Sequence, residues 1–301
     1  MIDILLATYN SELFLAEQLD SIIAQDCSNW RLIVRDGGST DKTLVKLQEY
    51  QQKLGSEKFI IIGNNEPSSA LDNFCELLTH TRSEYIMFCD HDDVWLKNKI
   101  SLSLNHIQKI SNQNQPVLVF TDKKIVDENL NILAESFFYY LRLNPYKLQL
   151  NNLITQNVAS GCTMLFNREL LQLLNIEMMQ KYAVMHDHWI VLVAQLFGKI
   201  SYLNKPTMLY RQHSKNVYGA TKLKNKLKKV QFIRNKFYLD CYQCEGLLVN
   251  YNQKIKKKTN ITLREFANLP KMNYFKRRYI LFKYKIFKHG FGRTASALLL
   301  I

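Results

Sequence analysis

Residues 84–95 read EYIMFCDHDDVW, and this stretch indicates both a buried strand and a charged site at its end. An apolar run of strand length covers Glu84–Cys89. It stops at three carboxylates within four residues, those of Asp90, Asp92 and Asp93. Such carboxylates repel one another unless a cation or solvent compensates their charge. Because magnesium typically takes one or two protein carboxylates together with substrate phosphates, we interpret the cluster as a site for a metal and a diphosphate. The alternative is a solvated acidic turn before the next helix.

Upstream of this stretch, strand-like and helix-like segments alternate. The strand-like segments are Ile2–Thr8, Trp30–Arg35 and Phe59–Ile62, and helical periodicity covers Glu12–Ala24, Asp41–Leu54 and Leu71–Leu78. This alternation predicts an α/β fold with a doubly wound, mainly parallel sheet and flanking helices. In open sheets of this class, ligands bind at the carboxyl ends of the strands. We therefore expect one rim to carry the polar residues that follow the first, second and fourth strands: Thr8, Tyr9 and Asn10, then Asp36, then the cluster that begins at Asp90.

The character of the chain changes near residue 220. Before that point, further strands are predicted at Val117–Thr121, Thr163–Phe166 and Lys199–Leu203, a helix around His188–Phe197, and irregular structure over residues 127–160. From Lys222 onward the segments are basic and helix-like, including Lys222–Tyr238 and Met272–Lys288. We divide the chain into an α/β domain, residues 1–220, and a basic helical extension, residues 221–301.

A glycine-containing turn, Asp36-Gly37-Gly38-Ser39-Thr40-Asp41, follows the second strand. Glycines permit a tight turn and a close approach of the backbone to a ligand. Asp36 could accept hydrogen bonds from a nucleotide base or ribose, and Thr40 is a candidate N-cap for the next helix. An ordinary strand-to-helix turn explains the same residues. The turn is neither a P-loop nor a dinucleotide fingerprint, because neither glycine pattern is present.

Two later polar segments are further candidates for a site. In His186-Asp187-His188-Trp189, a carboxylate near a helix N-terminus is electrostatically favoured, and Asp187 could act as a general base. An N-cap role for Asp187 is the alternative, and the two roles are compatible. In Tyr210-Arg211-Gln212-His213, Arg211 could pair with a phosphate and His213 could bind a metal. A polar strand end explains that segment equally well.

The charge of the chain is concentrated at its C-terminal end. The formal net charge is +14, but residues 221–301 contain 20 Lys and Arg against three Asp and Glu, a balance of +17. An anionic partner is therefore expected: a membrane surface, nucleic acid or a phosphorylated substrate. The N-terminus lacks the basic region of a secretory signal, and no apolar run reaches the roughly 18 residues of a membrane span. We expect six reduced cysteines in a cytoplasmic protein, with Cys241 and Cys244 as buried helix residues.

Taken together, these motifs resemble those of the family 2 glycosyltransferases of the GT-A (Rossmann-like) fold, over roughly Met1–Gly219. The resemblance is greatest to bacterial rhamnosyltransferase-like members that build O-antigen or capsule. It implies nucleotide contacts from Thr8, Tyr9 and Asn10, and a base-binding turn at Asp36. Asp90-His91-Asp92-Asp93-Val94-Trp95 resembles the DxD motif, with Asp92 as the metal ligand. Asp187 matches the catalytic base, and Tyr210-Arg211-Gln212-His213-x-x-Asn216-Val217-x-Gly219 resembles the segment that closes over the donor diphosphate.

The resemblance implies inversion in a single displacement, with Mg²⁺ or Mn²⁺ bound and a nucleoside-diphosphate sugar as donor. Rhamnose from a dTDP donor follows from similarity alone, and the acceptor is expected to be a saccharide or a lipid-linked saccharide. His188 departs from the aromatic or acidic residue of many relatives, which leaves acceptor choice open. The membrane spans and Q-x-x-R-W motif of processive synthases are absent, which favours transfer of a single sugar.

Two other functions are compatible with parts of the sequence. A sugar nucleotidyltransferase would share the fold, but its glycine-rich, basic phosphate loop is missing after the first strand. A non-enzymatic nucleic-acid-binding protein would explain the basic extension, yet residues 1–220 contain no nucleic-acid-binding motif, and we expect no nucleic-acid partner. Aromatic residues alternate with the cations in Met272–Lys288, as in a basic amphipathic surface helix. Peripheral contact with the inner face of the cell membrane is one expectation for this segment; packing of the aromatic side chains on the catalytic domain is the other.

Overall fold

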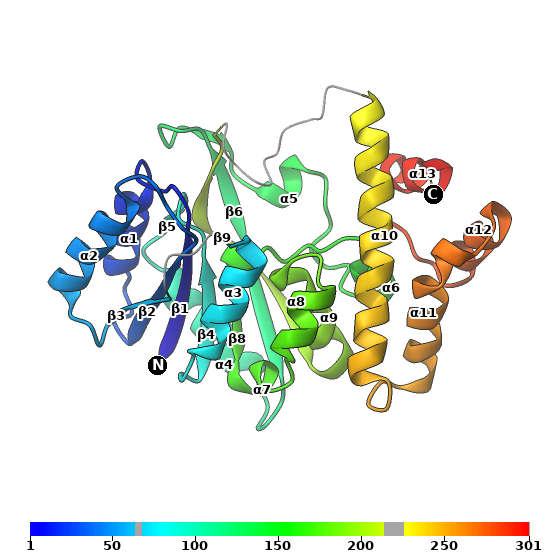
Figure 1. Cartoon of the computed structure of the whole chain (residues 1–301), viewed down its shortest axis with the longest axis horizontal. Helices are drawn as coiled ribbons and strands as arrows, with labels where there is room; N and C mark the ends of the chain where they lie inside the picture. The colour runs from blue at the N-terminus through cyan, green and yellow to red at the C-terminus, as the bar shows by residue number, and fades with distance from the viewer. Residues whose placement is uncertain (64–67, 214–225, 301) are drawn as a thin grey trace.

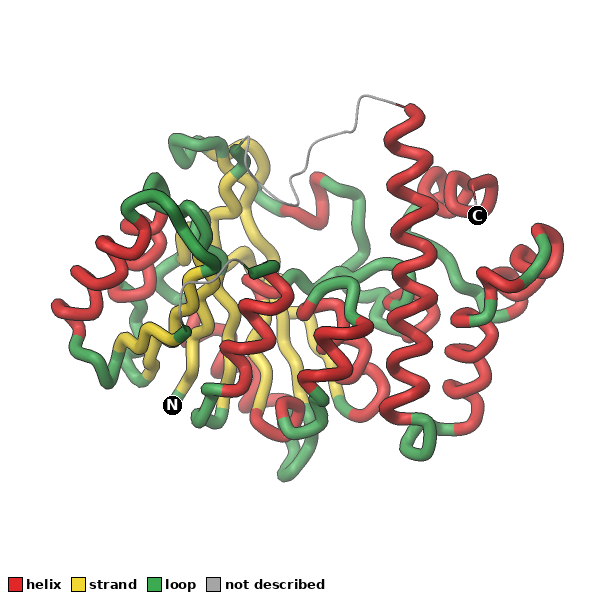
Figure 2. The backbone as a smooth tube through the Cα atoms, viewed as in Figure 1, coloured by secondary structure: helices red, strands yellow, loops and turns green. Residues whose placement is uncertain are grey.

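The computed structural model describes residues 1–63, 68–213 and 226–300. In these residues a single mixed sheet is covered by helices on both faces (Figures 1 and 2). The strands are β1 (Ile2–Thr8), β2 (Trp30–Asp36), β3 (Phe59–Ile62), β4 (Tyr85–Cys89), β5 (Val94–Trp95), β6 (Val117–Val126), β7 (Ile132–Ala134), β8 (Met164–Asn167) and β9 (Lys199–Arg211). The helices of the α/β body are α1 (Leu15–Ile23), α2 (Thr43–Leu54), α3 (Ala70–Thr79), α4 (Lys99–Ile110), α5 (Phe137–Tyr140), α6 (Leu150–Leu153), α7 (Arg168–Leu171), α8 (Ile176–Tyr182) and α9 (His186–Phe197), with a 3-10 turn, η1, at Gly161–Thr163.

The strands lie in the order β3-β2-β1-β4-β8-β6-β9-β5, and β7 pairs with β6. The first four strands of this order are all parallel, as the alternation of strands and helices predicts. Antiparallel pairs enter at β8, which lies between β4 and β6. The register places Thr8 opposite Asp36, and Leu6 opposite Cys89. The polar segments after β1, β2 and β4 therefore begin side by side on one rim of the sheet, as expected.

The sheet separates two apolar cores because alternate residues of a strand point to opposite faces. In β1, Leu5 belongs to one core, and Ile4 and Leu6 belong to the other. The core around Leu5 is completed by helices α3, α8 and α9. The core around Ile4 and Leu6 is completed by α1, α2 and α4. Burying both faces stabilises the parallel strands, which have the near-continuous apolar sequences typical of such a position.

Four further helices follow in the C-terminal part: α10 (Lys226–Tyr251), α11 (Lys257–Ala267), α12 (Tyr274–Lys283) and α13 (Phe291–Leu300), with a 3-10 turn, η2, at Leu269–Lys271. The long helix α10 stands beside α8 and α9, and α11 and α12 lie on its outer side (Figure 1). Side chains of α10 and α11 belong to the same core as α9. Cys241 and Cys244 are buried on α10, which confirms that part of the prediction. The proposed boundary at residue 220 lies outside the described residues.

Several helix and strand limits differ from the sequence-based prediction. Helix α2 begins at Thr43, and its N-cap is Lys42 rather than Thr40. The amide of Thr40 instead donates to Asn10 Oδ1 at 2.9 Å, which keeps Thr40 in the loop before the helix. Strands β6 and β9 continue well past their predicted ends because they pair in parallel from Val117 to Val126, although both sequences become polar. Within the described ranges, no helix is long and apolar enough to cross a bilayer.

Candidate active site

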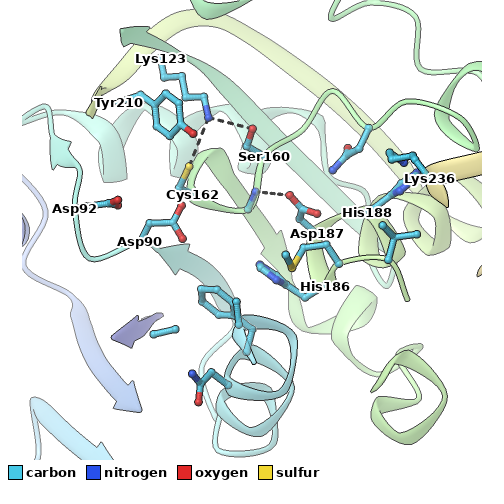
Figure 3. Close-up of a pocket in the computed structure, with 18 of the residues that line it drawn as sticks. Asp90, Asp92, Lys123, Ser160, Cys162, His186, Asp187, His188, Tyr210 and Lys236 are labelled. Carbon is cyan, nitrogen blue, oxygen red and sulfur yellow. Dashed lines mark hydrogen bonds between the residues drawn. The ribbon is translucent and has the colours of Figure 1, made fainter. Parts of the chain in front are cut away.

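A cavity of about 1380 Å³ opens at the carboxyl-terminal rim of β1 and β4. Four groups of predicted site residues line it: Thr8, Tyr9 and Asn10 after β1, Asp90 and Asp92 after β4, Asp187 on α9, and His213 after β9. Figure 3 shows Asp90 and Asp187 on either side of the 160–162 segment. The tertiary structure therefore brings the acidic loop and the candidate base into a single cavity.

The turn after β2 holds the residues of this rim in place through hydrogen bonds. Asp36 is fully buried, and its carboxylate accepts hydrogen bonds from Thr8 Oγ1 at 2.8 Å and from the backbone N–H of Ser39 at 2.7 Å. Its oxygens also accept from Gly38 N and Ser39 Oγ. Asp36 is not among the described residues that line the cavity. Its carboxylate shapes the turn and orients Thr8, and its assignment to a nucleotide base stays a prediction.

Asn10 joins the loops that follow β1 and β2. Its backbone has a φ of 45°, a left-handed conformation that Asn tolerates better than most residues. The backbone N–H of Asn10 donates to Ser39 Oγ at 2.8 Å, so the two loops are held together. Tyr9, next to it, is 55% exposed, and its ring is available to a ligand in the cavity.

The three carboxylates of the acidic cluster have different environments. Asp90 and Asp92 line the cavity, whereas Asp93 is fully buried behind them. Asp93 Oδ1 accepts from the backbone N–H of Arg211 at 3.1 Å, and Oδ2 has no hydrogen-bond partner among the described residues. Burial and the two neighbouring carboxylates raise the pKa of Asp93 well above its usual value. Burial, with Asp92, also raises the pKa of Asp90.

Asp92 and His213, which sequence reasoning assigned to a metal, are in direct contact. His213 Nε2 lies 2.8 Å from Asp92 Oδ2 although 121 residues separate them. A different trio, Asp90, Asp93 and Cys162, has ligand atoms within 4.8 Å of one another. Hard divalent ions such as Mg²⁺ prefer oxygen ligands to a thiol such as that of Cys162, and Asp93 is not among the described residues that line the cavity. The carboxylates of Asp90 and Asp92, which face the cavity, fit a divalent cation and a diphosphate better.

Arg211 lies behind the acidic loop. It is 1% exposed, and it is not among the described residues that line the cavity. Its Nε donates to the carbonyl oxygen of Asp92 at 2.9 Å, its guanidinium pairs with Glu17, and it stacks over Phe14 at 4.5 Å. These contacts hold the loop that carries Asp92. The assignment of Arg211 to a phosphate stays a prediction, and the rest of that motif, residues 214–219, lies outside the described residues.

Asp187 lies in the first turn of α9 and does not cap it. The N-cap is Met185, and Asp187 Oδ2 instead accepts a hydrogen bond from the backbone N–H of Gly161 at 3.1 Å. Residue 161 must be small, because a Cβ there would lie 2.7 Å from His186 Nε2. Burial raises the pKa of Asp187 to about 6, against the hydrogen bonds from Gly161 and His188 that lower it. A carboxylate with this pKa suits a general base near neutral pH.

The histidines beside Asp187 are buried and neutral. His186 packs against the rings of Phe74 and Phe88, at 4.0 and 4.6 Å between centroids, and neither of its ring nitrogens has a hydrogen-bond partner among the described residues. His188 Nε2 lies 2.7 Å from the carbonyl oxygen of Leu153, which makes Nε2 the protonated nitrogen. Burial lowers the pKa of each histidine to about 3. Neither imidazole therefore carries charge at neutral pH.

Sequence reasoning missed Lys123, a cation in the same cavity. Its Nζ lies 3.2 Å from Ser160 Oγ and 3.6 Å from the centroid of the Tyr210 ring. Within the described part of the chain, no carboxylate is within ion-pair distance of this ammonium group, although Lys123 is only 4% exposed. Its electrostatic influence reaches both Asp90 and Asp187. Lys123 was missed because the strand was predicted to end at Thr121, and a lysine inside a buried strand would have been the signal.

The sheet order, with helices on both faces, is that of the GT-A fold. The model of glycosyl transferase family 2 matches residues 3–174, and the chain belongs to this family.

Two relatives and one solved structure show how similar the chain is to known members. It is 30% identical over 248 residues to the dTDP-rhamnosyl transferase RfbG of Shigella flexneri, covering 77% of this chain and 80% of that protein. It is 26% identical to the UDP-Glc:alpha-D-GlcNAc-diphosphoundecaprenol beta-1,3-glucosyltransferase WfgD of Escherichia coli, over 57% of this chain and 62% of that protein. The structure of S. aureus TarS 1-349 in complex with UDP-GlcNAc superposes with a TM-score of 0.60 at 16% identity, covering 94% of this chain and 80% of that one. This last likeness concerns the fold.

Proposed function

We propose that this chain is an inverting glycosyltransferase of surface polysaccharide synthesis that transfers one sugar, rhamnose, from a nucleoside-diphosphate donor. The acceptor in this proposal is a saccharide carried on a lipid. The single observation that carries the proposal is that Asp187, a partly buried carboxylate, lines the same cavity as Asp90 and Asp92. The name of the rhamnosyl relative supports the donor, and that of the diphosphoundecaprenol-dependent relative supports the acceptor class.

In the proposed mechanism, Asp187 removes the proton from an acceptor hydroxyl as its oxygen attacks the anomeric carbon of the donor. The bond from that carbon to the diphosphate breaks in the same step, so the configuration inverts and the nucleoside diphosphate leaves. The transition state has oxocarbenium character, as in glycoside hydrolysis. Because burial raises the pKa of Asp187 to about 6, the group is ionised at neutral pH and still basic enough to accept a proton.

Asp90 and Asp92 would hold Mg²⁺ or Mn²⁺ together with the donor diphosphate. A bound divalent ion supplies positive charge that stabilises the departing diphosphate. His213 contacts Asp92 at 2.8 Å and orients its carboxylate. Lys123 lies beside the segment that separates Asp90 from Asp187 (Figure 3), and its positive charge influences both carboxylates. We place the sugar–phosphate bond of the donor near it.

A membrane contact at the cytoplasmic face completes the proposal. Helix α12 buries Ile280 and Leu281, but four of its aromatic side chains are exposed: Tyr274, Phe275, Tyr279 and Phe282. The exposed cations Lys276 and Lys283 belong to the same helix. Other aromatic residues of the extension, such as Phe237, pack into the shared core. The exposed aromatic side chains of α12 support the proposed membrane contact. Buried ones such as Phe237 support the alternative, packing on the catalytic domain.

A donor screen tests the proposed function. Purified protein with Mg²⁺ is incubated with dTDP-rhamnose, UDP-glucose, UDP-GlcNAc or GDP-mannose, and release of the nucleoside diphosphate is measured with lipid-linked saccharide acceptors. We expect dTDP-rhamnose to be the best donor, and Asp187→Asn to lower turnover by about two to four orders of magnitude. Asp187→Asn should still bind the donor. Turnover with none of these donors, or full turnover by Asp187→Asn, contradicts the proposal.

A further inference from the structure

The cavity extends beyond Asp187 to the C-terminal helices, where its lining changes from acidic to basic. Phe232, Lys236 and Leu239 on α10 line this part, as do Lys288 and Arg293. Among the described lining residues, carboxylates occur only at Asp90, Asp92 and Asp187. The part of the cavity beside Asp90 and Asp92, called the donor half, is therefore suited to a cation. The part beside Lys236, Lys288 and Arg293, called the far half, is suited to an anion.

Lys288 is one of the cations in this half that lack a close counterion among the described residues. Its side chain is partly buried, and within the described residues its ammonium group has no carboxylate at ion-pair distance. The nearby carboxylate of Asp240 is paired with Lys236 at 2.6 Å. Burial lowers the pKa of Lys288; Asp240 opposes this effect, and Lys236 and Arg293 add to it. Positive charge thus exceeds negative charge around the partly buried Lys288. A bound anion would balance this excess charge.

The start of helix α13 adds to the same anion preference. Gly292, in the first turn of this ten-residue helix, lines the cavity. Apart from its chain neighbours and its own helix backbone, no described residue has a heavy atom within 4 Å of the position that a Cβ on Gly292 would take, so this side of the turn is open to the cavity. The N-terminal end of a helix carries unpaired backbone N–H groups and a partial positive charge, and it favours phosphates.

Apolar surface continues from this basic end of the cavity. Phe232, Lys236 and Leu239 are spaced i, i+4 and i+7, and therefore lie on one face of α10. Phe232 is 52% exposed and Leu239 is 49% exposed. A ligand whose phosphate binds at the lysines would have this apolar strip beside it.

We propose that Lys288 and Lys236, with the first turn of α13, bind a phosphate group of the acceptor, and that Phe232 and Leu239 contact an apolar chain esterified to that phosphate. This inference rests on the proposed function and deepens it by assigning the acceptor side of the cavity. The phosphate takes no part in bond making. Its role is to place the acceptor sugar, which is attached to it, against Asp187.

A binding experiment with the donor half occupied tests the assignment. Full-length protein is saturated with dTDP and Mg²⁺, so that added diphosphates cannot enter the donor site, and is titrated with farnesyl diphosphate, farnesol or inorganic pyrophosphate. We expect farnesyl diphosphate to bind more tightly than either farnesol or pyrophosphate. Lys288→Met should weaken its binding by about tenfold or more, since hydrogen bonds to charged groups are worth about 1.5–3 kcal/mol. Lys288→Arg should retain most of the affinity.

The matched control is Lys257→Met, which removes an exposed lysine of α11 outside the cavity lining and should leave all three affinities unchanged. Equal binding of farnesol and farnesyl diphosphate, or unchanged farnesyl diphosphate affinity in Lys288→Met, overturns the phosphate site. Pyrophosphate binding as tight as that of farnesyl diphosphate overturns the apolar contact. Donor turnover is measured on the same preparations: if it persists while the phosphate site is overturned, only this inference fails, whereas absence of turnover in wild type contradicts the proposed function instead.

Discussion

The side-chain amide of Gln243 on α10 donates a hydrogen bond to Nδ1 of His188 on α9, at 3.2 Å. The carbonyl oxygen of the same amide accepts from the backbone N–H of Val184 at 2.8 Å. His188 also bonds to Leu153 through its other nitrogen. One side chain of the C-terminal helices therefore fixes the segment that enters α9 and the residue next to Asp187.

We expect Gln243→Met to lower turnover by a few fold while the KM for the donor stays nearly constant. The substitution leaves His188 Nδ1 and the Val184 N–H without partners, a loss of about 1–3 kcal/mol per buried group. Steady-state kinetics with thermal unfolding separate the effect on the base from a general loss of stability. Gln231→Met, at an exposed position of the same helix, is the control. A larger change in KM than in kcat would contradict a positioning role for Gln243.

The raised pKa of Asp187 makes activity and stability depend on pH in opposite directions. Turnover should fall as the pH drops below about 6, because the base becomes protonated. The pKa is about 6 in the folded chain but about 4 in the unfolded chain. The stability contributed by protonation of Asp187 is therefore complete below pH 4 and is lost as the pH rises through 6.

Asp187→Asn removes this ionisation and should be the more stable protein at pH 8. Two pKa units correspond to at most about 3 kcal/mol, and the difference should shrink by about half at pH 5. Thermal unfolding of both proteins at the two pH values measures it. If Asp187→Asn is less stable than wild type at pH 8 but as stable as wild type at pH 5, the folded structure does not raise the pKa of Asp187.

Asp92→Asn should raise the concentration of Mg²⁺ or Mn²⁺ needed for half-maximal activity. The change preserves size and removes the charge proposed to hold the metal. Activity is titrated with each ion after treatment with a chelator. Glu135→Gln serves as control, since this carboxylate has a 69% exposed side chain and lies outside the cavity lining. Near-wild-type activity of Asp92→Asn at low metal would rule out the assignment.

Lys123→Met should weaken binding of dTDP by about tenfold or more and leave dTMP unaffected, because only the diphosphate reaches the ammonium group. Lys123→Arg keeps the charge and should retain most of the affinity. Lys124→Met is the matched control, because Lys124 is the next residue of β6 and pairs with Glu135. Equal losses for dTDP and dTMP would indicate a structural role for Lys123 and not a contact with the second phosphate.

Helix α12 should attach the protein reversibly to anionic vesicles. Basic segments gain about 1 kcal/mol per Lys or Arg near such a surface, and salt screens the attraction. Co-sedimentation with anionic and neutral vesicles at low and high salt measures it. Replacing Phe275 and Tyr279 by Ser should reduce attachment, whereas Tyr139→Ser, an 88% exposed aromatic on α5, should not. Attachment that does not depend on lipid charge or salt concentration would rule out an electrostatic membrane contact.

Local patterns in the sequence were sufficient to predict the first half of the fold. The predicted limits of β1 and β3 match the structure, because runs such as Ile2–Thr8 are apolar and end at a polar residue. The parallel order follows from the alternation of strands and helices, and the rim from the register of Thr8 with Asp36. Short helices such as α7 and α8 were not predicted, because tertiary packing stabilises segments too short to form helices alone.

By itself, the sequence identified the candidate site residues that line one cavity: the carboxylates of Asp90 and Asp92 after β4 and Asp187 at the start of α9. Their identity follows from charged groups placed at the ends of apolar segments, which is local information. Only the tertiary structure decided which side chains face the cavity. Asp36 and Arg211 face the protein, and Lys123 faces the cavity, because contacts such as that of Arg211 with Asp92, 119 residues apart, depend on how the strands assemble. Long-range packing, which no local pattern encodes, therefore distinguishes the residues that line the cavity from those that support them.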